Sequence, residues 1–236
     1  MSAAVKPAPK RVNNTKPALR KPPPRERARI QEIFDRFAAG DSHPKTELNY
    51  KNPFTLVVAV ALSAQATDVG VNKATAKLFE DADTPQAMAD LGVDGLTAYI
   101  KTIGLYRNKA KNVIALSHII LDQHAGQVPL EREALMALPG VGRKTASVVL
   151  NELDIEPAIA VDTHVFRVSH RLKIAKGTNP DKVEAELMAI VPAPYLTRAH
   201  HWLILHGRYV CVARKPKCMA CVVADLCPSR SLFMGA

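Results

Sequence analysis

The chain has 236 residues, of which 47% are hydrophobic and 5% aromatic, and its formal net charge is +10. This length and composition are typical of one or two globular domains rich in helix. No run of 18 apolar residues occurs, so we expect no membrane-spanning helix, and the first residues lack the apolar core of a secretory signal.

Most of the positive charge lies in the first 29 residues, which hold nine basic side chains and one acidic side chain. Residues 1–24 also contain six prolines and no acidic residue. Such a composition cannot bury enough apolar surface to fold, so we predict a disordered basic arm. The arm indicates a polyanionic partner, although solubility or contact with a membrane surface would explain it equally well.

From residue 25 onward the apolar residues recur at helical spacing and no convincing set of strands appears, so we predict an all-α fold. Ile30, Ile33, Phe34 and Phe37 mark the first helix, and Asp68 and Thr84 are expected N-caps. Further helices are predicted at Phe54–Gln65, Asp68–Glu80, from Pro85 onward, and at Tyr106–His124, Glu131–Ala137, Arg143–Glu152, Thr163–Leu172, Pro180–Ile190 and Pro194–His206. Beyond Gly207 the pattern loses its regularity.

A short glycine-containing segment, Leu138–Gly142, separates two of these predicted helices. Glycine lets the backbone adopt a positive φ and lets a ligand approach closely. The free N–H groups at the start of the next helix favour a phosphate. We therefore predict that Gly140, Val141, Gly142 and Arg143 hold a nucleic-acid backbone without reading bases. An ordinary turn between two packed helices is the alternative, but the cations at 143 and 144 and the basic arm favour a polyanion.

Lys144 falls in the first turn of the predicted helix Arg143–Glu152, at the positive end of its dipole. That position disfavours a charged ammonium and favours the neutral amine that attack on a sugar carbon requires. A surface lysine that reaches phosphate or solvent is the more common alternative. Asp162 precedes the helix Thr163–Leu172, where it is expected either to cap that helix or to face Lys144 and stabilise a cationic sugar. The two roles of Asp162 are compatible.

Four cysteines lie within 17 residues near the end of the chain, at Cys211, Cys218, Cys221 and Cys227. Four sulfur ligands in one loop suit either zinc or an iron–sulfur cluster, and the abundance of structural zinc sites favours zinc. A redox-active pair at 218 and 221 would leave two cysteines unexplained. The cations between the first two cysteines, Arg214, Lys215 and Lys217, are expected to reach phosphates, the alternative being a solvated basic turn.

These motifs together resemble the bacterial endonuclease III family of helix-hairpin-helix DNA glycosylases. The resemblance rests on LSAQATD at 62–68, IGLY at 103–106, LPGVGRKTA at 138–146, VDTH at 161–164, HWLILHGR at 201–208 and the cysteine spacing. It implies a six-helix barrel domain with the hairpin at 46–156 and a cluster domain made of 25–45 and 157–236, with a DNA-binding groove between them. It also implies a [4Fe–4S] cluster on the four cysteines in place of zinc.

The same resemblance implies the chemistry, which is removal of oxidised pyrimidines from duplex DNA and strand cleavage 3′ to the abasic site. Lys144 would attack C1′ and form a Schiff base, while Asp162 would assist proton movement and stabilise positive charge. Gln65 and Leu105 resemble residues that fill the space of a flipped base, although a helix-end glutamine and a buried leucine are the structural alternatives. His164 is expected near the site.

Two other functions stay open at this point. A monofunctional mismatch glycosylase would use Asp162 and water, but the lysine at position 144 argues against it. A non-catalytic metal-containing DNA-binding module would bind DNA without turnover. The expected partner is double-stranded DNA with damaged bases or abasic sites, and we expect a monomer in the bacterial cytoplasm, associated with the nucleoid and not with a membrane.

Overall fold

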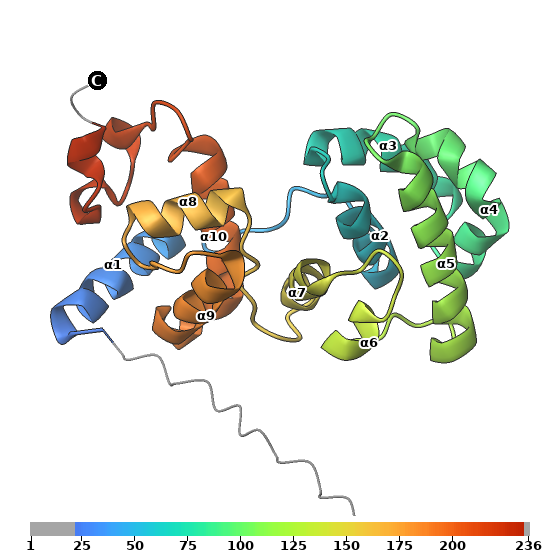
Figure 1. The fold of residues 1–236 in the computed structure, drawn as a ribbon, viewed down its shortest axis with the longest axis horizontal. Helices are drawn as coiled ribbons and strands as arrows, with labels where there is room; N and C mark the ends of the chain where they lie inside the picture. Colours follow the sequence, from blue (N-terminus) through green and yellow to red (C-terminus); the bar gives the residue numbers. More distant parts are fainter. Residues whose placement is uncertain (1–21, 234–236) are drawn as a thin grey trace, which may run out of the picture.

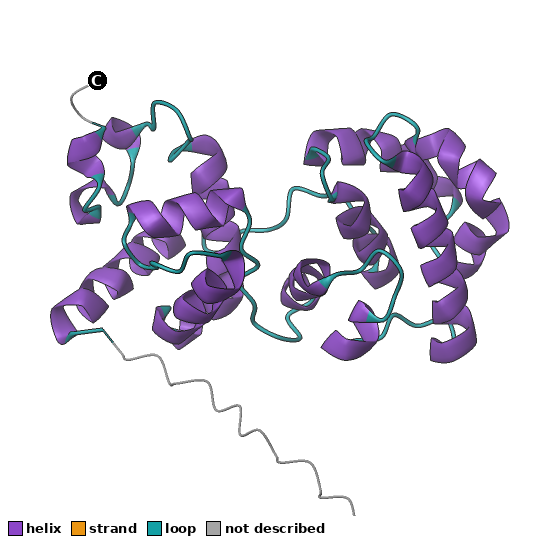
Figure 2. Cartoon of the chain, viewed as in Figure 1, coloured by secondary structure: helices purple, strands orange, loops and turns teal. Residues whose placement is uncertain are grey.

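The computed structural model describes residues 22–233, and within this range every regular element is helical (Figures 1 and 2). The predicted all-α fold is therefore confirmed. Residues 1–21, which make up most of the predicted basic arm, lie outside the described residues, and the first helix already begins at Pro24.

The described helices are α1 (Pro24–Gly40), α2 (Pro53–Ser63), α3 (Asp68–Asp81), α4 (Pro85–Ile100), α5 (Tyr106–His124), α6 (Arg132–Met136), α7 (Arg143–Glu152), α8 (Thr163–Arg171), α9 (Pro180–Ile190) and α10 (Leu196–Tyr209). Short 3-10 helices follow at η1 (Ala193–Tyr195), η2 (Cys218–Ala220), η3 (Ala224–Leu226) and η4 (Arg230–Leu232). The predicted loss of regularity beyond Gly207 is thus seen as a chain of brief turns.

The helices gather into two lobes, each with its own hydrophobic core (Figure 1). The first lobe consists of α2–α7, with a core that includes Leu56, Leu78 and Leu116. The second lobe consists of α1 and α8–α10, where Phe34 of α1 packs beside Trp202 of α10. Among the described residues the two cores share no member. Segments 41–52 and 153–162 connect the lobes, which places α7 and α10 at the boundary.

Side-chain caps fix where several of these helices begin. Asn52 and Thr55 form a reciprocal capping box at the start of α2, and Thr84 accepts a hydrogen bond from the backbone of Ala87 at the start of α4, as predicted. Asp162 caps α8. Each cap satisfies N–H groups that have no partner inside the helix, and such a cap stabilises a helix by about 1 kcal/mol.

Two sequence-based helix boundaries and one predicted cap were wrong. Helix α2 ends at Ser63 and not at Gln65, because Gln65 adopts a left-handed backbone with φ of 54°. Asp68 does not cap α3: Thr67 accepts the hydrogen bond from Gly70 instead, while the Asp68 carboxylate binds Arg208. The predicted helix Pro194–His206 is a 3-10 turn followed by α10, which runs on to Tyr209.

Within residues 22–233, none of the helices combines the length and the apolar character that crossing a membrane requires.

Candidate active site

A groove of about 840 Å³ lies between the two lobes and contains several of the predicted site residues. The first lobe contributes Gln65 and Lys144 to its lining, and the second lobe contributes Asp162 and His164. The predicted nucleophile and the predicted carboxylate, which lie on different lobes, therefore face the same space.

Helix α7 presents Lys144 to this groove from its first turn. The N-cap of α7 is Gly142, which offers no side-chain hydrogen bond to the free N–H groups of the helix. The apolar side chains Ala146, Val149 and Leu150 of α7 are buried in the core of the first lobe. This burial anchors the helix by one face and leaves Lys144 exposed on the other.

Asp162 is held firmly at the start of α8. Its Oδ1 accepts hydrogen bonds from the backbone N–H groups of His164 and Val165, each at 2.8 Å. Both bonds fall on one carboxylate oxygen, so Oδ2 is available to a substrate. The His164 ring lies beside Arg167, at 3.3 Å from Nδ1 to Nη2. Asp162 therefore caps α8 and also presents its carboxylate to the groove, as the sequence allowed.

Two consecutive histidines of α10, His200 and His201, also line the groove. His200 is only 4% exposed, and its Nδ1 has no hydrogen-bond partner among the described residues. Burial, with contributions from His201 and Lys144, lowers the pKa of His200 to about 3. His200 is therefore a neutral imidazole at physiological pH, close enough to Lys144 to sense its charge.

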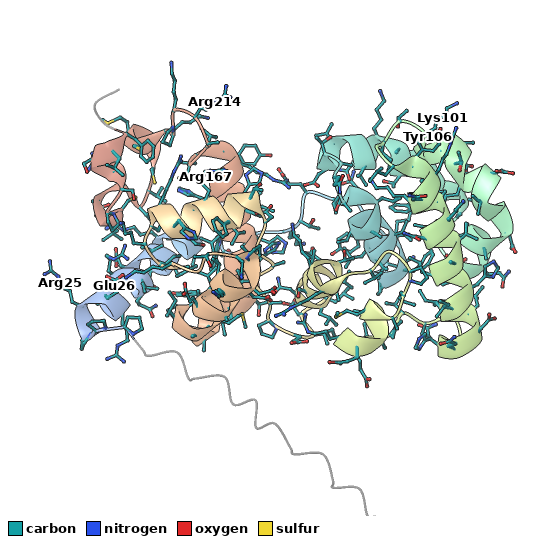
Figure 3. All side chains as sticks on the ribbon, in the orientation of Figure 1. Arg25, Glu26, Lys101, Tyr106, Arg167 and Arg214 are labelled. Carbon is teal, nitrogen blue, oxygen red and sulfur yellow. The ribbon has the colours of Figure 1, made fainter. Side chains whose placement is uncertain are left out.

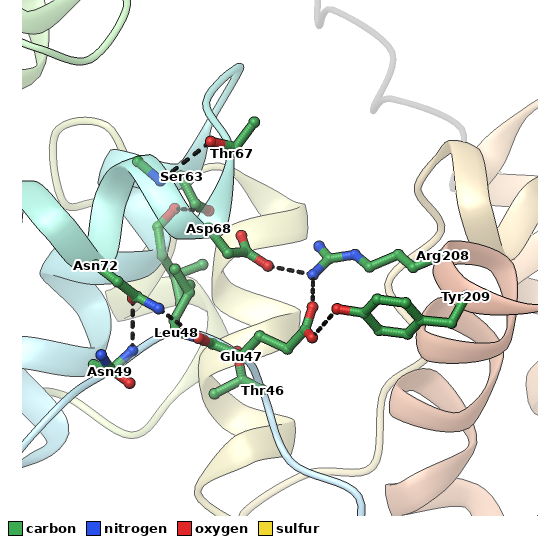
Figure 4. Close-up of polar contacts among 12 residues, drawn as sticks. Thr46, Glu47, Leu48, Asn49, Ser63, Thr67, Asp68, Asn72, Arg208 and Tyr209 are labelled. Atoms are coloured by element: carbon green, nitrogen blue, oxygen red, sulfur yellow. Dashed lines mark hydrogen bonds and ion pairs between the residues drawn. The ribbon is translucent and has the colours of Figure 1, made fainter.

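A network of ionised side chains bridges the lobes at one end of the groove (Figure 4). Arg208 of α10 forms ion pairs with Glu47, which lies in the connection before α2, and with Asp68 of α3. Tyr209 donates a further hydrogen bond to Glu47. Burial raises the pKa of Glu47, but the hydrogen bonds from Tyr209 and Arg208 outweigh it and leave that pKa below its usual range. The network joins α10 directly to the first lobe.

The two residues predicted to fill the space of a flipped base share an unusual conformation. Gln65 and Leu105 both have a left-handed backbone, with φ of 54° and 58°, and Leu105 is 58% exposed. Residues other than glycine pay a steric penalty in this region, and such strain is concentrated at functional sites. The structural alternative of a buried leucine is excluded for Leu105. Gln65 lines the groove, whereas Leu105 lies outside its lining.

The predicted hairpin lies between α6 and α7, and of its two glycines Gly140 alone has a positive φ, since Gly142 is extended with φ of −86°. Gly140 has φ of 80°, and a Cβ atom there would lie 3.0 Å from the Cβ of Asn112. The N–H of Val141 donates to the carbonyl of Leu138, which closes the turn. Arg143 pairs with Glu184 of α9 at 3.0 Å. The hairpin residues 140–143 lie outside the lining of the groove.

The four cysteines surround one cavity at the end of the second lobe and form no disulfide. Yet no three His, Cys, Asp or Glu side chains of residues 22–233 are arranged to hold a single metal ion. Zinc requires four sulfurs at about 2.3 Å from one centre, so thiols spread around a cavity fit a cluster of several iron atoms better. Burial raises the pKa of the Cys221 and Cys227 thiols, which means that a cation is needed to hold them as thiolates.

Arg171 of α8 secures the loop between the first two cysteines. Its guanidinium donates to the carbonyls of Val212 and Ala213 at 2.8 and 2.9 Å and to the sulfur of Cys211 at 3.4 Å. The predicted phosphate contacts Arg214, Lys215 and Lys217 are exposed on this loop. In Figure 3, Arg214 of the second lobe and Lys101 of the first lobe both extend from the same edge of the molecule.

Comparison with known proteins identifies the family. Residues 58–193 match the HhH-GPD superfamily of base excision DNA repair proteins, a span of more than half the chain. The chain belongs to this superfamily. Residues 211–227, which begin and end at cysteines, match the iron–sulfur binding domain of endonuclease III. The predicted [4Fe–4S] cofactor and the predicted enzyme class, a base excision repair DNA glycosylase and lyase, are confirmed for this HhH-GPD chain.

Individual relatives cover almost the whole chain. Endonuclease III of Escherichia coli strain K12 is 58% identical over 201 residues, or 85% of this chain and 95% of the relative. A non-covalent endonuclease III–DNA complex matches with a TM-score of 0.82 and 43% identity, over 89% of this chain and 99% of the other. A trapped endonuclease III–DNA covalent intermediate matches with a TM-score of 0.81 and 43% identity, over 88% and 98%. The resemblance drawn from the motifs is thus confirmed.

Sequence reasoning gave no role to Glu152, His200 or His201, which the structure places in or behind the groove of this HhH-GPD protein. Two signals pointed to them. The two histidines are adjacent and begin at the edge of the HWLILHGR segment, and Glu152 puts a carboxylate at the negative end of a helix dipole, where acids are disfavoured.

Proposed function

We propose that this glycosylase excises oxidised pyrimidines from duplex DNA and then cuts the strand 3′ to the abasic site, with Lys144 as nucleophile and Asp162 as its partner. The observation that carries the proposal is that Lys144 of the first lobe and Asp162 of the second lobe line one groove. A base turned out of the duplex needs such a space between the lobes.

The reaction follows from these two groups. The lone pair of Lys144 Nζ attacks C1′, and the bond from C1′ to the base breaks as the base leaves with its electron pair and takes up a proton. The sugar ring then opens as the C1′–O4′ bond breaks, which gives a Schiff base. Loss of a proton from C2′ breaks the C3′–O bond, and water releases the product. Asp162, fixed by two backbone N–H groups, stabilises the positive charge at the sugar and passes protons.

The proposed DNA contacts divide between the lobes. Gln65 and Leu105 occupy the vacated space in the duplex, and their strained, exposed backbones support this role. The hairpin Gly140, Val141 and Gly142 binds a phosphate with the free N–H groups of α7. Arg143 assists it, which requires its guanidinium to leave Glu184 or to reach past it, and His164 approaches the reacting sugar.

The second lobe contributes the cluster loop. We propose that the ligands of the [4Fe–4S] cluster are Cys211, Cys218, Cys221 and Cys227. When bound, the cluster would supply the positive charge that balances their four thiolates and would so fix the loop. Arg214, Lys215 and Lys217 then project from a rigid base toward phosphates. In this assignment a barrel domain at 46–156 and a cluster domain at 25–45 and 157–236 bind opposite sides of one DNA site, and the basic residues of 1–24 add non-specific affinity.

The proposed partner is double-stranded DNA that carries a damaged base or an abasic site, bound by a monomer in the bacterial cytoplasm at the nucleoid. Both lobes contribute to one groove within a single chain, so the site needs no second copy.

Borohydride trapping on a duplex with an abasic site tests the proposal. Wild type should give a covalent protein–DNA adduct, Lys144→Ala should give none, and Lys73→Ala, at an exposed lysine of α3, should match wild type. A duplex with thymine glycol should lose its base and be cut, while the undamaged duplex stays intact. Base release without adduct or strand cleavage would show a monofunctional enzyme and overturn the role of Lys144.

A further inference from the structure

Helix α7, which carries Lys144, is attached to the second lobe at both of its ends. At its start Arg143 pairs with Glu184 of α9, at 3.0 Å from Nη2 to Oε2. At its end Asn151 donates to the backbone carbonyl of Thr197 at 2.8 Å. The position of α7 against the second lobe is therefore set by polar contacts at two points, with Lys144 between them.

The last residue of α7, Glu152, makes the most buried of these contacts. Its Oε2 lies 3.1 Å from Nε2 of His201, and the two side chains are 5% and 6% exposed. Its Oε1 accepts a hydrogen bond from the hydroxyl of Tyr50 at 3.0 Å. Three parts of the chain thus meet at one carboxylate: the connection before α2, the end of α7, and α10.

Glu152 does not stabilise the helix to which it belongs. A carboxylate in the last turn lies at the negative end of the helix dipole and weakens the helix. Burial alone would raise the pKa of Glu152, but the hydrogen bonds from His201 and Tyr50 outweigh burial and leave that pKa lowered. Glu152 is thus unfavourable for its own helix, yet both of its carboxylate oxygens have partners outside that helix, His201 and Tyr50. This combination indicates a role in the junction between the lobes.

The junction lies directly behind the groove. His201 lines the groove and also contacts Glu152 through Nε2. Helix α10 also packs closely on α8, because the carbonyl of Gly207 accepts a hydrogen bond from Arg167 at 2.8 Å. Since Asp162 caps α8, the path from Glu152 through α10 to α8 fixes Asp162 relative to Lys144.

We propose that Glu152 is a positioning residue of this enzyme, which through His201 and Tyr50 holds the end of α7 on α10 and so sets the separation of Lys144 from Asp162. This inference rests on the proposed role of Lys144 as nucleophile. It assigns to Glu152 no contact with DNA and no part in proton transfer. Its effect should therefore appear in the chemical step and not in the affinity for DNA.

Single-turnover trapping with borohydride on an abasic-site duplex, with enzyme in excess, separates rate from amount. Glu152→Ala should lower the rate constant of adduct formation about 10- to 100-fold, because a displacement of about 1 Å at a distance from the reaction has effects of this size. The final amount of adduct and the Kd for a duplex with a tetrahydrofuran abasic analogue should match wild type. Unfolded molecules lower only the amount, so the rate constant reports on positioning.

Three further variants sharpen the test. Glu152→Gln keeps the shape and can bond to both partners, so its rate should stay close to wild type, and Tyr50→Phe should slow the step less than Glu152→Ala. The control is Glu156→Gln, since Glu156 forms its ion pair with Arg132 inside the first lobe, at 2.9 Å, and should react as wild type does.

Each possible result either supports or overturns the positioning role of Glu152. An unchanged rate constant for Glu152→Ala, or a loss of adduct at an unchanged rate, overturns the positioning role. A fall in rate matched by an equal weakening of the Kd for the analogue does so too, because the defect then lies in binding. No adduct from wild type overturns the proposed function itself, and the positioning role falls with it.

Discussion

Replacing His200 with glutamine should remove part of the acid sensitivity of the fold. His200 is 4% exposed, and burial, His201 and Lys144 lower its pKa to about 3. In the unfolded chain a histidine titrates near 6.5. The folded state therefore binds no proton at His200 where the unfolded state does. The stability that the neutral ring provides is fully present above pH 6.5 and is lost as the pH falls from 6.5 toward about 3.

The magnitude follows from the two pKa values. At pH 5.5 about ten of every eleven unfolded chains carry a proton on this ring and the folded chain carries none, which lowers the free energy of unfolding by about 1 kcal/mol relative to pH 7.5. Urea unfolding of wild type and His200→Gln at the two pH values measures this quantity. The stability advantage of wild type over the variant should shrink by about that amount at pH 5.5.

Taking the difference between wild type and variant cancels the other groups that titrate in this range. A wild-type advantage over His200→Gln that stays constant between pH 7.5 and 5.5 would refute the reasoning, because the ring would then gain its proton in the folded chain as readily as in the unfolded chain.

Three other changes probe the packing that positions the site. Gly207→Ala places a Cβ 2.9 Å from the Cβ of His164, and the overpacking should outweigh the gain in helix propensity and lower the free energy of unfolding by about 1 kcal/mol in urea; a stabilised variant would contradict this. Asn52→Ala removes the capping box of α2 and should cost about 1 kcal/mol, and an unchanged thermal midpoint would count against it. Arg171→Leu removes the hydrogen bonds to the carbonyls of residues 212–213, so visible iron–sulfur absorption should decay faster with a chelator, and equal decay would show that the loop needs no such support.

The sequence predicted best those helices whose ends depend on local chemistry. The bounds Tyr106–His124 and Arg143–Glu152 agree with α5 and α7, because a periodic apolar face and a preceding turn determine them. The start of α3 at Asp68 was predicted correctly, but its capping residue was not, because Asp68 is engaged by a distant partner. Asp68 binds Arg208, 140 residues further along the chain, so Thr67 takes over the cap. No pattern within a short window contains that information.

The candidate site divides in the same way. Lys144 and Asp162 stand next to local signals, a glycine hairpin and a helix start, and the family resemblance joined them into one mechanism. Glu152 and His201 carry only weak signals, an acid at the negative end of a helix and a pair of adjacent histidines, and neither signal says that the two side chains meet. Their burial to 5% and 6% appears only when α7 meets α10. A residue that acts through a contact between the lobes can be identified only once the arrangement of the two lobes in space is known.

The way the lobes are joined explains why such contacts should affect the chemical step. The two hydrophobic cores share no residue among those described, whereas the contacts across the groove are polar and include Arg208–Asp68 and Glu152–His201. The partly exposed Arg208–Asp68 pair is individually weak and is screened by salt, whereas Glu152–His201 is buried, so we expect the width of the groove to depend on both contacts.

In the proposed complex, DNA is held by the hairpin of the first lobe and by the cluster loop of the second lobe, and it therefore also influences the width of the groove. Many phosphate contacts contribute to the affinity, so loss of one contact between the lobes changes the Kd little. The rate of attack, in contrast, depends on the single distance from Lys144 to C1′ and on the distance to Asp162, because attack requires one narrow range of geometry. A defect in the junction between the lobes should therefore leave DNA binding intact and slow the formation of the Schiff base.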